Sequence, residues 1–440
     1  MNVNSYKNFI ERNALIPLRK LEASPLKPEG FPFISLQSQI NDEGLSLDDF
    51  YFNPNNRESP YCYYRATVLL DFSSIDHKIA EIKGLINKIN KDINESVAKK
   101  DFDRFLALVD SRLAPELFIE VFNFIPDQDK YRLFERVWKY NENSHEVFTE
   151  EFIKKAVPFK GVTSAQPVAD EAGYVEVYLS QDSEELSPEQ ASLWTTDVNI
   201  AILHALPFDP VPAIYRGRIH LNHIISYDNN ELKKELQVKP NMVKQLAAMD
   251  LINLLEFDIE LRASGIIRQY NAYSEQINND WFHNPQGIHA LSHTKRVLLL
   301  SLIISYLEKY CEEDSHLLCL ASIYHDIGRK NDGYDPDHGI TSYDKLINDK
   351  LLALDHYQNQ EMLRFLVQNH AIPDQSAYKM LNRYDLIDVD RTLRLYGAFK
   401  DADGLDRVRI KDLNPEYLRT GSAKRLLLAA HQLYSQQVID

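Results

Sequence analysis

Tyr324-His325-Asp326-Ile327-Gly328-Arg329 is the stretch of this 440-residue chain from which the interpretation of its C-terminal half starts. It places an imidazole directly beside a carboxylate, at the end of the apolar run 317–324. The run predicts a buried helix, and a buried carboxylate without a partner is costly. A bound cation accounts for both side chains, because imidazole and carboxylate are common metal ligands. The stretch therefore predicts a metal site.

A second group of candidates precedes this stretch. The segment 287–297 follows Pro285 and contains His289, His293 and Arg296 at spacings of three and four residues. In a helix these side chains share one face. The two histidines could both bind a metal, or one could bind it while the other moves a proton. Arg296 adds a planar cation suited to phosphate.

A third group follows it. The apolar segment 365–370 ends in His370, and Asp401, Asp403 and Asp406 come after the apolar residues near 396–399. Asp401 is the predicted metal ligand of this group. Asp403 and Asp406 could equally cap a helix or form salt bridges instead of binding a metal.

Taken in order, three motifs resemble the H…HD…D signature of the HD superfamily of metal-dependent phosphohydrolases. They are His293-x-x-Arg-Val, His325-Asp326-Ile-Gly-Arg and Lys400-Asp-Ala-Asp-Gly-Leu-Asp406, and the resemblance covers residues 280–435. It implies an all-helical domain in which His293, His325, Asp326 and Asp401 bind a divalent cation. Members with a second metal have further histidines between the HD pair and the last aspartate, and His338 and His370 occupy such places. The implied cofactor is one or two ions of Mn, Fe, Mg, Zn, Co or Ni.

This chemistry assigns roles to the neighbouring residues. A bound cation lowers the pKa of water from ~15.7 toward ~7 and polarises a phosphoryl oxygen. Asp326 could bind the ion and orient the water, and His289 is the candidate proton carrier. The cations predicted to neutralise the phosphoryl oxygens are Arg296, Arg329 and Lys330. His338 or His370 could instead contact the substrate phosphate or act as a general acid.

Several functions remain open. The favoured one is hydrolysis of a phosphoester or phosphoanhydride bond in a small nucleotide-like molecule. The chain lacks the Gly-Tyr-Pro element of the cyclic-dinucleotide esterases, which argues against that substrate. The histidine set also resembles the di-iron HD-type oxygenases, and His289, His293 and Arg296 resemble phosphodiesterases that cleave protein-linked phosphoribosyl or ADP-ribosyl groups. A nucleotide-sensing regulatory protein is the non-enzymatic possibility.

The N-terminal half has a different pattern, so the predicted fold is a multidomain α+β protein. Residues 1–60 are expected to be irregular because of prolines at 17, 25, 28, 32 and 54, residues 62–72 to form a strand and residues 76–140 to form helices. Short strands and a helix near 198–205 are expected within 157–240, and a long helix within 242–270. The boundary near 245 separates an α+β domain, 1–245, from an all-helical HD-type domain, 246–440.

One part of this half resembles ADP-ribosyltransferases. Trp194-Thr-Thr-Asp197 is similar to a helix start of those enzymes, which precedes a strand ending in a Glu-x-Glu pair beside NAD. Lys233 stands where the first glutamate would be, so only Glu235 remains. A degenerate or merely similar module is therefore the favoured interpretation, and a working NAD site is the less favoured one.

Composition excludes some classes of partner. The net charge of −16 provides no basic surface for duplex nucleic acid. The three cysteines form neither a zinc motif nor a disulfide framework, and no apolar run approaches the ~20 residues of a membrane span. Because the polar N-terminus lacks a signal peptide, a cytoplasmic location is expected, with signal-independent export open. The oligomeric state does not follow from the sequence.

Overall fold

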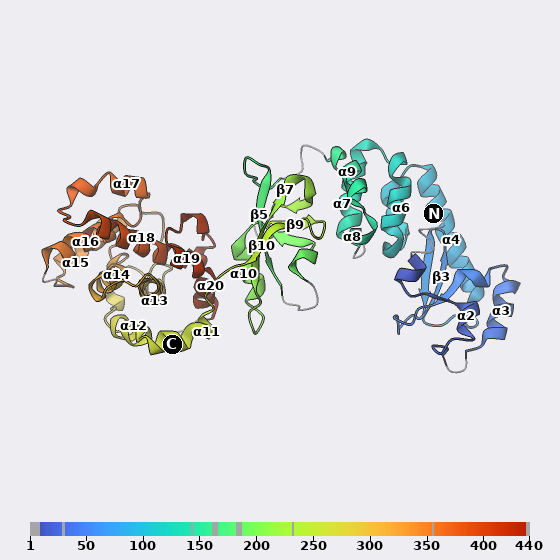
Figure 1. Cartoon of the computed structure of the whole chain (residues 1–440), viewed down its shortest axis with the longest axis horizontal. Helices are drawn as coiled ribbons and strands as arrows, with labels where there is room; N and C mark the ends of the chain where they lie inside the picture. The colour runs from blue at the N-terminus through green and yellow to red at the C-terminus, as the bar shows by residue number, and fades with distance from the viewer. Residues whose placement is uncertain are drawn as a thin grey trace. The chain divides into compact units, whose positions relative to one another are not determined.

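The computed structural model describes residues 9–28, 31–141, 144–160, 166–181, 187–230, 233–353 and 356–436. The chain is a mixed α+β protein with two antiparallel sheets, as the sequence predicts (Figure 1). It divides into two compact units, and each is described separately below.

The first sheet lies in the N-terminal region and is more regular than expected. It has the order β1-β2-β3-β4, formed by Ile16–Pro17, Phe50–Phe52, Tyr61–Arg65 and Val68–Phe72. The prediction that residues 1–60 are irregular was wrong, because they also contain the short helix α2 (Leu18–Leu21) and the helix α3 (Phe33–Asp42). The single strand predicted for 62–72 is a hairpin, because Ala66 adopts a positive φ of 53° and turns the chain between β3 and β4.

Helices follow this sheet, as the spacing of apolar residues predicts. Their bounds are Ile79–Ala98 (α4), Phe102–Leu108 (α5), Ala114–Val121 (α6), Asp127–Lys139 (α7), Ser144–Val147 (α8) and Glu150–Ala156 (α9). An aromatic cluster joins several of them: the ring of Phe118 lies 5.6 to 6.2 Å from those of Phe122, Phe134, Phe148 and Phe152. Burial of these rings stabilises the helices against one another.

The second sheet has the strand order β10-β7-β5-β6-β9-β8. Its strands are Tyr174–Ser180 (β5), Leu193–Thr195 (β6), Ile214–His220 (β7), Ile224–Asp228 (β8), Glu235–Val238 (β9) and Lys244–Ala248 (β10). The predicted helix near 198–205 is α10 (Val198–Ala205). The prediction of one long helix within 242–270 was wrong. Residues 244–248 pair with the sheet as β10, and the helical part begins only at Leu254 and is divided at Gly265, whose φ is 82°.

Within 254–353 and 356–436, every regular element is helical. The α-helices are Leu254–Ala263 (α11), Ile266–Ser274 (α12), Leu291–Leu307 (α13), Glu312–Tyr324 (α14), His338–Asn348 (α15), Tyr357–Asn369 (α16), Asp374–Tyr378 (α17), Val389–Leu405 (α18), Gly421–Arg425 (α19) and Leu427–Gln436 (α20). A 3₁₀ turn, Asp406–Ile410, extends α18.

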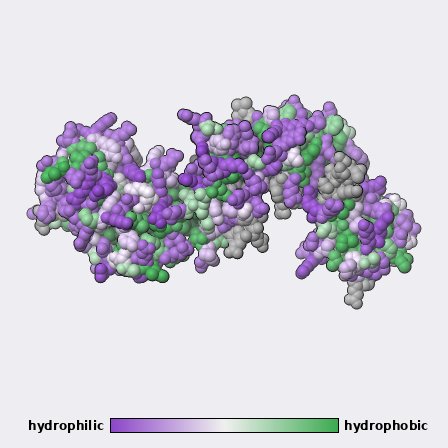
Figure 2. Space-filling model, in the orientation of Figure 1, coloured by the Kyte–Doolittle hydropathy of each residue, from purple (hydrophilic) through white to green (hydrophobic). Residues whose placement is uncertain are grey.

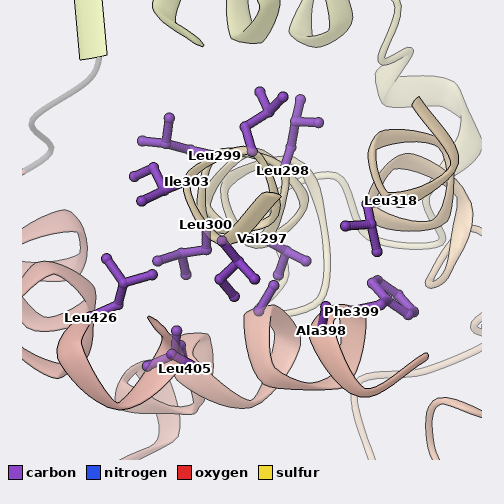
Figure 3. Packing of buried hydrophobic residues seen from close by; sticks show 14 of the residues in the cluster. Val297, Leu298, Leu299, Leu300, Ile303, Leu318, Ala398, Phe399, Leu405 and Leu426 are labelled. Atoms are coloured by element: carbon purple, nitrogen blue, oxygen red, sulfur yellow. The ribbon is translucent and has the colours of Figure 1, made fainter. Parts of the chain in front are cut away.

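Helix α13 is the centre of this helical unit. Every residue from Val297 to Ser305 is buried, so the helix is apolar on all sides. Figure 3 shows its side chains directed all around the helix, toward Leu318 of α14, toward Ala398 and Phe399 of α18 and toward Leu426. The polar first turn of α13 is therefore fixed in place by a large core, and this turn carries His293.

The two units do not follow one cut in the sequence. The first comprises Met1–Val177, Leu186–Thr196 and Gly217–Gln245, and the second Tyr178–Glu185, Asp197–Arg216 and Leu246–Asp440. The last change of unit falls at the residue where the sequence places its boundary, but α10 belongs with the later helices. The physical reason is its apolar face, since Val198, Ala201 and Ile202 join the core of the helical unit.

One face of the molecule is mostly polar in the space-filling view (Figure 2). Figure 2 shows a largely hydrophilic face on which apolar residues form separate small groups. Within the described residues, every helix falls short of the length and apolar character needed to cross a membrane.

A buried histidine makes the stability of the helical unit depend on pH. Burial lowers the pKa of His431 on α20 to about 4, and its Nε2 lies 3.0 Å from Asn199 Oδ1. Because the folded state disfavours protonation, this contribution is complete above the unfolded pKa of about 6.5 and is lost as the pH falls toward 4. Between pH 7 and pH 5 we expect a loss of about 2 kcal/mol in the free energy of unfolding from this group.

Urea unfolding at both pH values measures this loss. Glutamine at position 431 keeps an amide donor near Asn199 and does not titrate, so the variant is expected to lose about 2 kcal/mol less than the wild type. Equal losses in the two proteins would show that His431 titrates normally in the folded chain.

Candidate metal centre

Four helices deliver five of the candidate ligands to one place in the helical unit. His293 lies in the first turn of α13, and His325 and Asp326 directly follow the end of α14. His338 is the first residue of α15, and His370 directly follows α16. All five side chains are buried. The prediction that apolar helices end in these polar residues is confirmed for α14 and α16.

One group of donor atoms, which we call the first half-site, consists of His293, His325 and Asp403 with Oδ2 of Asp326. His293 Nε2 lies 3.0 Å from His325 Nε2, 3.5 Å from Asp326 Oδ2 and 3.4 Å from Asp403 Oδ1. A cation with bonds of about 2.1 Å holds neighbouring ligand atoms roughly 3.0 to 3.4 Å apart. The spacing of this half-site fits such an ion.

The protons on these rings favour a cation between them. His293 Nδ1 donates to Asp406 Oδ2 (2.7 Å), and His325 Nδ1 donates to the carbonyl oxygen of Ser322 (2.8 Å). A neutral imidazole has one N–H, so both Nε2 atoms carry lone pairs. Their 3.0 Å approach is therefore a contact of two acceptors rather than a hydrogen bond. Anchoring of the far ring nitrogen is typical of metal-binding histidines.

The second half-site repeats this arrangement on the other side of Asp326. It consists of His338 and His370, whose Nε2 atoms are 2.8 Å apart, with Oδ1 of Asp326 at 2.9 Å from His338 and 3.7 Å from His370. His338 Nδ1 donates to the carbonyl of Asp335, and His370 Nδ1 donates to that of Val367. Asp326 thus presents one carboxylate oxygen to each half-site.

Protonation states agree with metal binding. Burial lowers the pKa of His325 to about 3, and burial together with Arg409 lowers the pKa of His293. Burial opposes ionisation of Asp326, yet His325 and hydrogen bonds from neighbouring histidines lower the pKa of this carboxyl well below its usual value. His293 and His325 are therefore neutral and Asp326 is ionised, which are the forms that bind a divalent ion.

The predicted ligand Asp401 lies outside this cluster. It accepts hydrogen bonds from the backbone N–H groups of Arg419 (2.9 Å) and Thr420 (2.7 Å), so it holds the segment before α19. Asp403 takes its place because of helix phase. The ring of Phe399 packs 5.6 Å from that of His325, and Asp403 lies one turn further along the same face of α18. This one-turn spacing is a signal present in the sequence.

The other predicted residues divide into two groups. His289 and Arg329 lie at the cluster: His289 Nδ1 is 3.2 Å from Asp326 Oδ2, and Arg329 Nε donates to Asp326 Oδ1 (2.9 Å). His289 precedes α13 rather than sharing its face, because the helix begins only at Leu291. Arg296 instead forms an ion pair with Asp406, and Lys330 is exposed. Neither Arg296 nor Lys330 lines the cavity described next.

A cavity of about 1000 Å³ opens onto the cluster. Asp326, His338 and His370 contribute to its wall together with His289, Arg329 and Arg409. Arg409, which the sequence did not single out, places Nη2 3.1 Å from His289 Nδ1 and also donates to Asp406. The cluster is thus accessible to a molecule larger than water.

Comparison of the chain with protein-family models, curated proteins and solved structures gave no match. The case for the site therefore depends on its geometry. Three groups have donor atoms that lie close enough together to hold a metal ion: His289, His293 and Asp326; His293, His325 and Asp403; and His325, Asp326 and His370.

The predicted NAD residue is separate from this cluster. Glu235 lies on β9, opposite Thr195 of β6 on one side and Asp228 of β8 on the other. Glu235 is half-buried, and its role in binding NAD remains a prediction.

Alanine variants of Asp401 and Asp403 are expected to separate support from metal binding. Without Asp401, two N–H groups near α19 lose their acceptor, so we expect a loss of about 2–4 kcal/mol in the free energy of unfolding with unchanged metal content. Without Asp403, we expect at least a tenfold loss of metal affinity and a smaller change in stability. Elemental analysis and urea unfolding measure both quantities. If folded Asp401→Ala lost its metal while Asp403→Ala retained it, Asp401 would be the metal ligand and Asp403 would not.

Proposed function

We propose that the helical unit is a metal-dependent hydrolase of a phosphoester or phosphoanhydride bond, acting on a nucleotide-like substrate. The observation that carries this proposal is the pair of half-sites that share Asp326. The ordered motifs that resemble the HD superfamily support it, with Asp403 in place of Asp401 as the last ligand. A cytoplasmic location agrees with a nucleotide-like substrate.

The first half-site would hold one divalent ion, and the second half-site offers ligands for another. Mn, Fe, Mg, Zn, Co and Ni all accept the imidazole and carboxylate ligands present here, with different preferences. When bound, such an ion supplies Lewis acidity and lowers the pKa of a water molecule. Asp406 and Ser322 keep the ring nitrogens of His293 and His325 in the tautomer that binding requires.

The remaining residues of the cavity suit the other steps of hydrolysis. The oxygen of water forms a bond to phosphorus, the bond from phosphorus to the leaving oxygen breaks, and that oxygen takes up a proton. His289 lies beside Asp326 on the cavity wall, where it could give this proton. Arg329 and Arg409 provide positive charge near the phosphoryl oxygens, which gain charge as the reaction proceeds.

A second candidate substrate is a phosphodiester that joins a ribosyl group to a protein. The size of the cavity favours it, because about 1000 Å³ exceeds what a single phosphate group fills. Two exposed tyrosines, Tyr334 and Tyr417, lie on its wall, where a large substrate could contact them. Release of a phosphoribosylated peptide, lost in His289→Ala, would select this substrate over a free nucleotide.

Metal removal tests the proposed reaction. We expect the purified full-length protein to contain at least one divalent ion and to hydrolyse a member of a phosphoester panel. Chelation followed by desalting should remove the activity, and adding back one of the six metals should restore it. Hydrolysis that persists in the metal-free protein would contradict the proposal.

The same measurements distinguish hydrolysis from oxygenase chemistry and from regulation. Iron at two ions per chain with oxygen consumption would indicate a di-iron oxygenase. Tight metal-dependent nucleotide binding without turnover would indicate a regulatory protein whose output belongs to the N-terminal half.

A further inference from the structure

The two half-sites differ in two respects: the first includes a second carboxylate, Asp403, and the second includes a guanidinium group, that of Arg329. In the second half-site, Arg329 directs one nitrogen to each of three acceptors. Nε donates to Asp326 Oδ1 (2.9 Å), Nη2 lies 3.3 Å from His338 Nε2, and Nη1 donates to the carbonyl of Gly333 (3.2 Å). The side chain is only 12% exposed, so these contacts hold it in place.

Arg329 thus contacts two of the three atoms that would bind a second metal ion. His338 Nδ1 already donates to Asp335, so Nε2 carries the lone pair that Arg329 reaches. The third atom, His370 Nε2, lies 2.8 Å from His338 Nε2. A single positive charge already lies among the converging acceptors of this half-site.

The first half-site has no such group among the residues that the structure describes. No lysine or arginine in these ranges donates to His293 Nε2, His325 Nε2 or Asp403. Arg409, which lies on the cavity wall, directs its nitrogens to Asp406, His289 and the carbonyl of Ile288. Among the described residues, no lysine or arginine is therefore hydrogen-bonded to the acceptors of His293, His325 and Asp403, and the charge of Arg409 acts on them only from a longer distance, where it lowers the pKa of His293.

We propose that Arg329 is a built-in cation of the second half-site and limits the chain to one tightly bound divalent ion, held by the first half-site. A dication on Asp326 Oδ1 and His338 would lie beside the guanidinium, and the repulsion of like charges in a buried site is strong. It would also have to displace two hydrogen bonds of Arg329. The second ion therefore binds only weakly. This inference rests on the proposed metal-dependent function and adds the number of ions to it.

Titration of the full-length, metal-free protein with Mn²⁺ alone tests this proposal. Calorimetry and elemental analysis after desalting are expected to give one tightly bound ion in the wild type. Arg329→Gln removes the charge and is expected to retain two ions, with at least tenfold tighter binding of the second. Arg329→Lys keeps the charge and should retain one. Two tightly bound ions in the wild type, or a folded Arg329→Gln variant that retains only one, would overturn the proposal.

Lys379→Gln is the matched control, because it removes a positive charge from the same cavity wall. Lys379 is exposed and forms no ion pair with the described residues that carry the half-sites. The control should therefore bind one ion, as the wild type does. Two tightly bound ions in Lys379→Gln would assign the effect to the charge of the whole cavity and overturn the specific role of Arg329.

A spectroscopic measurement needs no variant. At two equivalents of Mn²⁺, the wild type is expected to show the six-line paramagnetic resonance signal of isolated Mn²⁺. A signal of two exchange-coupled ions would overturn the proposal even if Arg329→Gln failed to fold. One tightly bound ion without any hydrolysis contradicts the proposed function alone. Two coupled ions with hydrolysis contradict the role of Arg329 alone.

Discussion

Alanine in place of Asp326 is expected to abolish tight metal binding and to lower any phosphoester hydrolysis at least about a thousandfold. The reason is that Asp326 serves both half-sites, with Oδ2 3.5 Å from His293 Nε2 and Oδ1 2.9 Å from His338 Nε2. Among the described residues, Asp326 is the only carboxylate with oxygens within 4.0 Å of histidine nitrogens in both half-sites. Elemental analysis and initial rates on the purified variant measure the two losses.

Asp332→Ala is the matched control for this prediction. Asp332 lies on the wall of the same cavity but is exposed and accepts a hydrogen bond from Asn284 rather than from a histidine. Its variant should keep the metal content of the wild type. If Asp326→Ala retained its metal while remaining folded, the carboxylate that follows His325 would not be a ligand, and the site would have to be assigned anew.

Alanine in place of Gly328 is expected to destabilise the helical unit by at least about 3 kcal/mol. A Cβ atom at this position would lie 2.2 Å from the backbone nitrogen of Ser342 and 2.3 Å from the carbonyl carbon of Thr341. Backbone atoms of α15 would have to move, and α15 carries His338. Thermal unfolding should show a loss of roughly 6–12 °C in Tm for a unit of this size, together with weaker metal binding.

Gly421→Ala provides the comparison. A Cβ at Gly421, the first residue of α19, would meet no atom within 4 Å. Alanine there reduces the entropy of the unfolded chain and is expected to leave Tm unchanged or slightly raised. Equal Tm values for the Gly328 and Gly421 variants would mean that the approach of residue 328 to α15 is not needed for stability.

The ligands that follow apolar helices could be predicted because two simple signals coincide. Leu317 to Tyr324 must be buried, and a histidine and an aspartate at the end of such a run are difficult to satisfy without a cation. The choice between Asp401 and Asp403 required the phase of α18, which depends on what surrounds it. Phe399 shows the phase only once His325 is known to pack against it.

Arg296 could not be placed for a related reason. The helical period predicts which side chains share a face of a helix. It does not predict which group on another helix each of them contacts. Asp406 forms an ion pair with Arg296 and neutralises its charge. This pairing directs the Arg296 side chain away from the cavity. Asp406 and Arg296 are 110 residues apart in the sequence, so no local pattern reveals the pair.

The errors in the fold also arise from contacts that the local sequence does not contain. The turn at Ala66 lacks the glycine or asparagine that usually indicates a hairpin, so residues 61–72 resemble one strand. Residues 244–248 have an amphipathic pattern, but pairing with β7 makes them a strand. In both places tertiary hydrogen bonds override the local preference.

The ligands of the first half-site come from α13, from the end of α14 and from α18, and these segments bracket most of the helical unit. An ion bound to all of them would act as a reversible cross-link between helices that are distant in sequence. Unlike a disulfide, such a link exists only in the folded protein, so it stabilises the fold by the free energy of metal binding. Resistance to heat or to proteolysis would then report the metal supply of the cell, independently of any substrate.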